Sequence, residues 1–400
     1  MAKDISSPFT PGRPVPLELF VGRTTEIERL REKVRSAVAG RVEVGFVIGE
    51  RGIGKSSLAA FVRSLCERDL GVLGLHAFLG GVTSLEEMVR RVFDRLVKES
   101  VGKSWYERLK EPLGKHVREV GLFGLSFEFD VPKEELSRLV NDFGPALRGL
   151  LERLKGEKTG VLLILDDING LASSEQFANW LKSLVDAISV SQSPLPLCIL
   201  LVGLEDRRQA LIRLQPSLAR VFDLVEIRSW SEQETREFFA SAFSSVNIQV
   251  DEEALDVLAM YAGGLPVLAH EIGDAAFNAD DDGRIDAADA VRATVSAAEV
   301  VGRKHLEPQV FDSIRSKHYR SILRKIARLT PGEPISRAGI LELLSHDERP
   351  KLDNFLRKMV QLGVLEKDKE KGRGVYKFSS LLNSIYFRLE ARRAEKASAK

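Results

Sequence analysis

The sequence is short of long apolar runs, of cysteine and of any N-terminal leader pattern, and each shortage excludes a class of protein. No run approaches the roughly eighteen apolar residues of a membrane-spanning helix, so we expect none. The opening MAKDISSPFT has no apolar segment typical of a secretory signal. Cys66 and Cys198 both lie in apolar segments, are too few for a zinc site, and are expected to be reduced core residues. These absences predict a cytoplasmic protein.

The net charge is also small, but it hides an asymmetry. The 400 residues carry a formal charge of +1, and a chain of this length is expected to form two or three domains. Residues 301–400 hold 23 Lys and Arg against 12 Asp and Glu, so this part is strongly basic and the rest is acidic. Such a split indicates that the C-terminal part contacts a polyanion, or else that its solvated helical surface is simply basic.

Apolar runs alternate with amphipathic segments through the first part of the chain. Strands are expected at 42–49, 72–79, 161–167, 196–203 and 224–229. Helices are expected at 23–40, 55–66, 84–100, 133–155 and 174–189. The alternating segment 121–131 indicates a further strand or hairpin. This order predicts an α/β fold with a mostly parallel sheet that helices cover on both faces.

The strands stop at Ser231, which forms a capping-box pattern with Glu234 at the start of a helix. Further helices are expected near 251–262, 265–278, 286–298, 319–329 and 351–367, with one more inside 334–344. A charged turn between two short strands follows, so the C-terminal part is predicted to be an α+β winged helix. The expected domains are an extended arm at 1–22, an αβα core at 23–230 with a possible insertion at 101–131, a helical lid at 231–302, and a winged helix with a basic tail at 303–400.

The segment Gly49–Ser56 fits the pattern G-x-x-x-x-G-K-[ST] and lies between an expected strand and an expected helix. In such a P-loop the backbone N–H groups face phosphates, and the helix N-terminus adds partial positive charge. Lys55 is expected to reach the β- and γ-phosphates of ATP, and the Ser56 hydroxyl to bind Mg²⁺. The expected nucleotide-binding residues of this segment are Gly49, Glu50, Arg51, Gly52, Ile53, Gly54, Lys55, Ser56 and Ser57.

An acidic pair ends the apolar strand VLLILDD, as a P-loop enzyme requires on a neighbouring strand. Asp166 is expected to hold Mg²⁺ through water, and Asp167 to orient or deprotonate the attacking water. These residues predict hydrolysis of ATP to ADP and phosphate.

Two further motifs carry a family resemblance. Phe20, Val21, Gly22 and Arg23 precede the P-loop, and Gly264-Leu265-Pro266 lies in the helical part. With the P-loop and the acidic pair, these motifs resemble those of AAA+ and STAND ATPases, and above all the origin-recognition branch of AAA+. The resemblance covers about residues 11–300. It implies that residues 20–23 and Pro266 contact the adenine base.

The same resemblance implies an arginine finger that reaches the γ-phosphate in a neighbouring subunit. Arg220, between the fourth and fifth strands, is the main candidate, and Arg207 and Arg208 are secondary ones. The fourth strand ends in Val202-Gly203, without the polar residue that many AAA+ proteins use there as a phosphate sensor. This departure brings the chain closer to STAND proteins and implies slow hydrolysis.

Winged helices that bind DNA insert their third helix into the major groove, while the wing contacts the backbone. The expected contacts are Arg357 and Lys358 on the third helix and Lys367, Lys369, Lys371, Arg373 and Lys377 around the wing. Glu366, Asp368 and Glu370 alternate with the wing lysines and weaken their field. In the STAND proteins that the chain resembles, the winged helix is instead an internal clamp on the nucleotide domain, and both interpretations stay open.

Taken together, the sequence predicts a slow ATPase that uses ATP and Mg²⁺ and couples nucleotide state and self-assembly to double-stranded DNA. The alternative is a STAND-type signalling ATPase whose output is protein assembly, acting with a separate effector protein. No membrane contact is expected under either interpretation.

Overall fold

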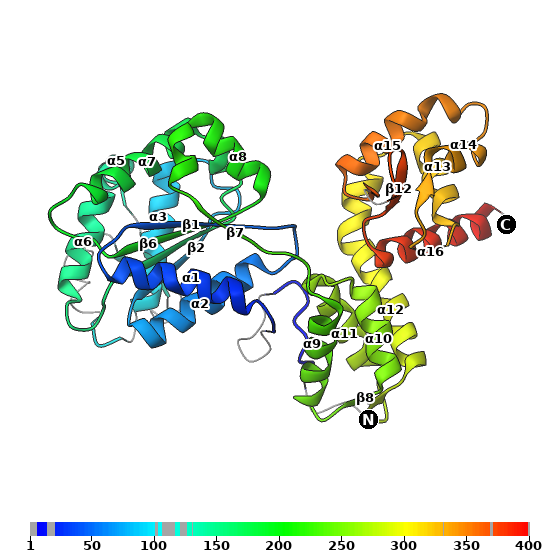
Figure 1. Cartoon of the computed structure of the whole chain (residues 1–400), viewed down its shortest axis with the longest axis horizontal. Coiled ribbons are helices and arrows are strands. Elements are labelled where there is room, and N and C mark those ends of the chain that lie inside the picture. Colours follow the sequence, from blue (N-terminus) through cyan, green and yellow to red (C-terminus); the bar gives the residue numbers. More distant parts are fainter. Residues whose placement is uncertain are drawn as a thin grey trace. The chain divides into compact units, whose positions relative to one another are not determined.

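The structure is a computed structural model that describes residues 6–13, 21–100, 103–105, 117–120, 126–129, 131–330, 332–368 and 371–398. Phe20, Lys369 and most of segment 101–131 lie outside these ranges. The chain divides into two compact units (Figure 1). We call residues 23–228 the sheet unit, and residues 1–22 with 229–400 the helical unit. Within the described ranges, no helix has the length and apolarity to cross a bilayer.

The sheet unit is built on a parallel sheet that has five strands within the described residues. In spatial order, the strands are β2 (Leu73–Phe78), β5 (Val161–Asp166), β6 (Leu197–Val202), β1 (Glu43–Ile48) and β7 (Asp223–Glu226). The two strands β5 and β6 are buried along their whole length, as their continuous apolar sequences predict. The carboxyl ends of β1 and β5 lie at the same edge of the sheet, on either side of β6. The P-loop follows β1, and the acidic pair ends β5. The predicted α/β fold is confirmed.

Helices cover both faces of this sheet, with α1 and α2 on one face and α7 and α8 on the other (Figure 1). The helices and 3₁₀ turns of these layers are α1 (Thr24–Val38), α2 (Lys55–Leu70), α3 (Leu85–Ser100), α7 (Glu175–Ser189), α8 (Glu205–Leu214), η2 (Leu171–Ser173) and η3 (Pro216–Arg220). Each helix buries its apolar stripe, for example Leu30 and Val34 of α1 and Phe177 and Leu181 of α7. The predicted helix positions are therefore correct in these layers.

The segment between α3 and β5 differs from two expectations. Its described hairpin pairs β3 (Val117–Val120) with β4 (Ser126–Phe129), so it starts before the strand or hairpin predicted at 121–131. The helix expected over 133–155 is two helices, α5 (Lys133–Asn141) and α6 (Phe143–Arg153). Pro145 explains this break, because it has no N–H to donate to the carbonyl of Asn141 and its ring crowds that carbonyl.

The helical unit begins with a bundle of α9 (Glu232–Ser244), α10 (Glu252–Ala262), α11 (Pro266–Ala279) and α12 (Ala287–Val301). Two short parallel strands, β8 (Gln249–Val250) and β9 (Arg284–Ile285), join its loops. The predicted capping box of Ser231 and Glu234 is present at the start of α9. A π-helix, η4 (Gly302–Phe311), follows α12 and was not predicted.

The described arm residues 6–13 anchor this bundle through Phe9. The Phe9 ring packs against Phe238 and Phe243, with ring centroids 5.8 and 4.9 Å away. The Thr10 N–H donates to Nδ1 of His270 at 3.0 Å. Gly273 leaves room for the ring, because a Cβ there would lie 2.3 Å from Phe9. The arm therefore belongs to the core of the helical unit.

The C-terminal part of the helical unit has helices α13 (Lys317–Ala327), α14 (Arg337–Glu342) and α15 (Leu352–Gln361), with a 3₁₀ turn, η5 (Arg349–Lys351), before α15. Its antiparallel sheet has the order β10 (Ile335–Ser336), β12 (Val375–Phe378), β11 (Leu365–Lys367). Three helices followed by a hairpin are consistent with the predicted winged helix.

One expectation for this part needs correction, and the basic tail has a structure that the sequence analysis did not specify. The helix predicted over 351–367 ends at Gln361, because Gly363 adopts a left-handed φ of 69° that starts the turn into β11. The basic tail is an ordered helix, α16 (Leu381–Ser398), that buries Leu382, Tyr386 and Phe387 in the core. Its basic residues therefore lie on the outer side of a packed helix.

Candidate nucleotide and nucleic-acid sites

The P-loop joins the end of β1 to the start of α2 and depends on two glycines. Gly54 adopts a left-handed φ of 91° at the N-cap of α2, a conformation that strains any residue with a side chain. A Cβ at Gly49 would lie 2.8 Å from the carbonyl oxygen of Ile227, so no side chain fits there. The loop thus leaves its backbone N–H groups and the α2 N-terminus facing one space.

Lys55 folds back over this loop. Its Nζ donates to the carbonyl oxygens of Gly49 at 2.9 Å and Glu50 at 2.7 Å. Burial lowers the pKa of Lys55, while the nearby charge of Asp166 acts against that shift. The two groups therefore interact electrostatically, and the lysine lies over the loop as a phosphate ligand requires.

Asp166 ends β5 and is 2% exposed. His76 of β2 lies next to it, with Nε2 2.8 Å from Oδ2 of Asp166. Because a carboxylate only accepts hydrogen bonds, His76 Nε2 is the donor. Sequence reasoning missed His76, although a polar residue inside the apolar strand VLGLHAFL was a signal.

Asp167 differs from its neighbour in both backbone and exposure. It has a left-handed φ of 58°, unusual for a residue with a side chain, and its side chain is exposed. The Asn169 amide donates to its Oδ1, and a Cβ built on Gly80 would lie 3.0 Å from its Oδ2. The turn thus directs the Asp166 carboxylate into the protein and the Asp167 carboxylate toward water. The two neighbouring carboxylates therefore suit different roles, one as a buried metal ligand and one in contact with water.

Arg23 ties the P-loop to its surroundings in the sheet unit. Its guanidinium donates to the carbonyl of Ile53 at 3.3 Å and to the carbonyl of Arg228. Arg23 itself is buried and adopts a left-handed φ of 64° before α1. The residue expected to contact the adenine base thus holds two backbone segments together.

The remaining P-loop residues surround this core. Ile53 is buried, Ser56 and Ser57 are half-buried, and Glu50, Arg51 and Gly52 are exposed. The site offers the oxygen donors that Mg²⁺ prefers, the Ser56 hydroxyl and the Asp166 carboxylate. The loop that only glycine can form and this donor set both fit a nucleoside triphosphate with its metal ion.

Comparisons with known proteins identify the domain. Residues 19–202 match the family of the AAA ATPase domain. This segment is an AAA ATPase domain. The match confirms the predicted AAA+ type of P-loop ATPase and the predicted enzyme class, an ATPase. No curated protein sequence matches the chain.

The likeness to solved structures extends beyond the AAA ATPase domain and covers most of the chain. The Walker-type ATPase PABY2304 of Pyrococcus abyssi is 19% identical, with a TM-score of 0.53 over 92% of this chain and 96% of that chain. The ORC2 protein of Aeropyrum pernix, in its ADPNP–ADP complexes, is 17% identical, with a TM-score of 0.57 over 98% of both chains. At these identities the likeness shows a common fold.

The other residues expected near the nucleotide belong to the helical unit. Pro266 is buried at the first turn of α11, next to Gly264, whose φ of 71° brings its carbonyl oxygen to the Trp230 N–H at 2.9 Å. Val21 is half-buried against the core of this unit. Gly22 has a left-handed φ of 68°, which favours glycine, and it lies against the Glu234 carboxylate. Both motifs thus pack at the start of the helical bundle.

The candidate arginine fingers differ in their partners. Arg220 ends the 3₁₀ turn η3, is exposed, and has no ion pair among the described residues. Arg207 lies 3.5 Å from Asp206, and Arg208 lies 2.6 Å from Glu205. The hydrogen bond that Arg208 donates to the Glu205 carboxylate also raises the pKa of Arg208. Of the three, Arg220 is the one whose guanidinium is available to a neighbouring molecule.

The basic residues expected to bind nucleic acid fall into two groups. Arg357 and Lys358 lie on α15 and line a cavity of about 580 Å³ together with Arg315 and Lys351. Around the wing, Lys367 ends β11, Lys371 and Arg373 are exposed in the turn, and Lys377 lies on β12. Lys377 is paired with Glu366 at 3.2 Å, and the Lys371 N–H donates to Asp368 at 3.0 Å. The acidic residues thus partly neutralise the wing, as their spacing predicts.

Proposed function

We propose that this chain is an ATP- and Mg²⁺-dependent switch that couples nucleotide state and self-assembly to binding of double-stranded DNA. The AAA ATPase domain supplies the nucleotide site, and the α15 face of the helical unit supplies the DNA site. The observation that carries the DNA part is a groove lined by four cations and by no acidic residue.

At the nucleotide site, each residue has a separate role. Lys55 binds the β- and γ-phosphates, and the backbone N–H groups of the loop donate hydrogen bonds to these negatively charged phosphates. Ser56 and Asp166 hold Mg²⁺, which when bound neutralises charge on the phosphates. The exposed Asp167 orients the attacking water and accepts its proton. The apolar end of β6 at Val202-Gly203 leaves no polar side chain to sense the γ-phosphate, which supports slow turnover.

At the DNA site, the cations gather where α15 faces the start of α13. Arg315, Lys351, Arg357 and Lys358 line this groove, with Asn354 and Gln361 beside them. Within the part of the chain that the structure describes, none of the four cations forms a close ion pair, although the charge of Asp353 interacts with Arg357. Their charge is therefore largely available to phosphates. Asn354, Lys358 and Gln361 follow helical spacing and share one face of α15. This face combines charge for affinity with amides that can contact base edges.

The groove therefore contributes more of the DNA affinity than the wing. The wing lysines alternate with acidic residues, and Glu366 already pairs with the Lys377 ammonium at 3.2 Å, whereas Asp368 binds only the backbone N–H of Lys371. An ion pair formed within the protein must break or be shared before the lysine can neutralise a phosphate. We thus assign the main phosphate contacts to Arg315, Lys351, Arg357 and Lys358.

Self-assembly is proposed through Arg220. Its exposed position after α8, with no ion pair among the described residues, suits a group that acts on the γ-phosphate of a neighbouring subunit. In such an assembly, Arg220 of one subunit would contact the γ-phosphate of the ATP that its neighbour binds. Nucleotide state would therefore control assembly.

The internal clamp of a STAND-type ATPase is a second candidate function. The neutralised wing and the apolar end of β6 both favour it. Under this alternative the groove cations have no nucleic-acid ligand, and the output is a protein assembly. The two functions differ in whether duplex DNA binds the purified chain.

The experiment measures the affinity of a labelled duplex by fluorescence anisotropy across a salt series. We expect affinity to fall steeply with salt, and Arg357→Ala with Lys358→Ala to reduce the salt slope by about two and to weaken binding at least about tenfold. The wing pair Lys371→Ala with Arg373→Ala should weaken binding less. Arg284→Ala serves as a control, because Arg284 is an exposed cation of β9 that is already paired with Asp251 at 2.9 Å. Absence of duplex binding in every nucleotide state overturns the DNA proposal and favours the clamp.

A further inference from the structure

The buried contact between His76 and Asp166 follows from the strand register. β2 pairs with β5 so that Phe78 lies opposite Asp166 and His76 opposite Ile164. Side chains two residues apart on a strand share a face, so His76 is the diagonal neighbour of Asp166. The imidazole reaches across to Asp166 at 2.8 Å, and both side chains are 3% exposed. Within the described residues, this is the one side-chain hydrogen bond to Asp166.

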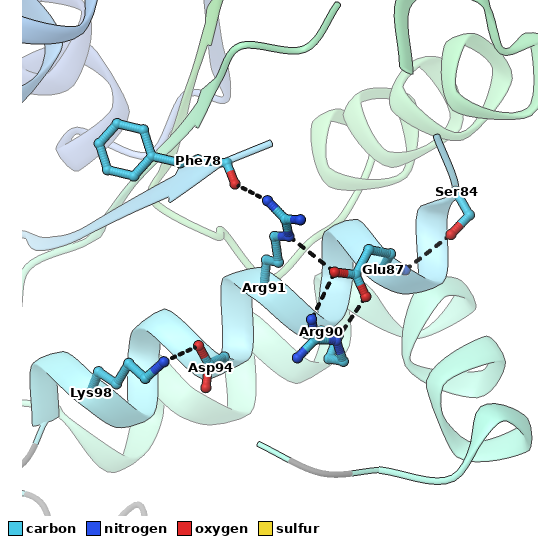
Figure 2. Close-up of polar contacts among 7 residues, drawn as sticks. All are labelled: Phe78, Ser84, Glu87, Arg90, Arg91, Asp94 and Lys98. Carbon is cyan, nitrogen blue, oxygen red and sulfur yellow. Dashed lines mark hydrogen bonds and ion pairs between the residues drawn. The ribbon is translucent and has the colours of Figure 1, made fainter. Parts of the chain in front are cut away.

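Phe78 and α3 hold the imidazole from the other side. The Phe78 ring stacks on the His76 ring with a centroid distance of 4.4 Å and an interplanar angle of 21°. Phe78 is 49% exposed, so the ring is a cover over the imidazole and not a core residue. The Arg91 guanidinium donates to the Phe78 carbonyl at 2.7 Å, and Figure 2 shows it reaching from α3 to the end of β2.

Arg91 is itself positioned by its own helix. Glu87 accepts from Arg91 at 3.0 Å and from two nitrogens of Arg90 at 2.7 Å, as Figure 2 shows. These arginines hold the pKa of Glu87 below its usual range, with the hydrogen bond from Arg90 as the largest cause. The charge of Glu87 is therefore available to keep Arg91 in place, and Arg91 fixes the last residue of β2.

We propose that His76 is the positioning residue of the metal site, which sets the Asp166 carboxylate for Mg²⁺, and that Phe78 and Arg91 brace it. The inference rests on the proposed role of Asp166 as a metal ligand. A buried carboxylate has several rotamers and two oxygens, and a hydrogen bond to one of these oxygens limits the orientations that the carboxylate adopts. Because His76 binds Oδ2, Oδ1 is the oxygen of Asp166 that would be available to a bound metal ion, directly or through water.

This role differs from simple core packing in what it predicts. If His76 only filled space, a side chain of similar size would replace it without effect on Mg²⁺. If His76 orients Asp166, Mg²⁺ binding depends on a hydrogen-bond donor at the Nε2 position and not on the presence of a ring. Partners that orient metal ligands contribute about 10- to 100-fold to metal affinity, which sets the size of the expected effect.

The experiment uses the full chain and a fluorescent ATP analogue, titrated with Mg²⁺ and compared with the same analogue in EDTA. His76→Phe keeps a ring for Phe78 to stack on but removes the donor. It should raise the Mg²⁺ concentration for half-maximal binding at least about tenfold and change the affinity in EDTA by less than about twofold. His76→Gln, whose amide nitrogen reaches the Nε2 position, should stay within about threefold of the wild type.

Two further variants separate the inference from the proposed metal site. Asp166→Asn should raise the Mg²⁺ requirement by itself, and adding His76→Phe to it should cause no further rise, because His76 acts through Asp166. If His76→Phe does not fold, His76→Asn, whose donor is too short to reach, replaces it and should show the same rise. An unchanged Mg²⁺ requirement in the folded His76 variant, beside a raised one in Asp166→Asn, overturns the inference and leaves the metal site standing. No rise in Asp166→Asn overturns both.

Discussion

Arg23 Nη2 lies 3.3 Å from the carbonyl oxygen of Ile53, and the same guanidinium binds the carbonyl of Arg228. One buried side chain thus joins the start of α1, the P-loop and the segment after β7. These three segments are far apart in the sequence, and their contact fixes the loop that we propose binds the phosphates. A hydrogen bond from a charged group typically contributes about 1.5–3 kcal/mol.

Arg23→Ala should therefore loosen the P-loop and weaken ATP binding about tenfold or more, by loss of at least one such hydrogen bond. Isothermal titration of ATP with the variant checks this. Arg29→Ala is the matched control, since Arg29 lies on the surface of α1 and pairs with Asp223 at 2.6 Å. Equal affinities in the two variants would show that Arg23 does not support the loop.

Asp167→Asn should separate binding from chemistry. The exposed side chain of Asp167 faces water, while Asp166 is buried, so the substitution removes the proposed proton acceptor and leaves the proposed metal ligand. We expect the rate of phosphate release to fall about 10²- to 10⁴-fold, with ATP affinity unchanged within a few fold. Release at the wild-type rate in the variant would assign the general base to another residue.

Arg220→Ala should abolish most hydrolysis by acting on a neighbouring subunit. An arginine finger supplied from another molecule typically contributes about 10³- to 10⁵-fold to the rate. Mixing Arg220→Ala with the equally inactive Lys55→Ala should restore part of the activity, because mixed assemblies contain an intact loop facing an intact arginine. A mixture no more active than its components would place Arg220 outside the active site.

His270 should make the helical unit sensitive to acid. Burial lowers the pKa of His270 to about 4, from 6.5 in an open chain. Because the unfolded state binds the proton more tightly, the stabilisation is complete above about pH 6.5 and is lost as the pH falls toward about 4. The loss is on the order of 3 kcal/mol for such a shift.

Urea unfolding of the wild type and of His270→Gln at about pH 7.5 and about pH 4.5 checks this. The upper value is roughly one unit above the pKa of His270 in the unfolded chain, and the lower value is just above its pKa in the folded protein. The free energy of unfolding of the wild type should fall further than that of the variant. Equal falls in the two proteins would show that His270 is not the group that titrates.

Much of the sheet unit could be predicted from the sequence because its signals are local. The P-loop glycines and the apolar strands each depend on neighbouring residues, and the structure has both. The capping box of Ser231 in the helical unit is predicted for the same reason and is also present. The wrong boundaries also have local causes. Pro145 divides one predicted helix, and Gly363 ends another, and both residues were visible in the sequence.

The contacts around the acidic pair could not be predicted in the same way. His76 and Asp166 are neighbours only because β2 and β5 pair in one register, and periodicity does not fix which strands pair. The groove at Arg315 and Arg357 likewise requires α13 and α15 to pack together. Charge counting located a basic C-terminal part, but only the fold shows which cations are paired within the protein.

The most direct test of the account measures duplex DNA affinity in Mg²⁺ with ATP, with ADP and without nucleotide, for the wild type and for Lys55→Ala. The account predicts that ATP changes the affinity of the wild type by at least about fivefold relative to ADP, the lower end of typical coupling between two sites. It predicts that Lys55→Ala binds DNA with one affinity in all three states. Equal affinities of the wild type in every nucleotide state would contradict the coupling of ATP to DNA.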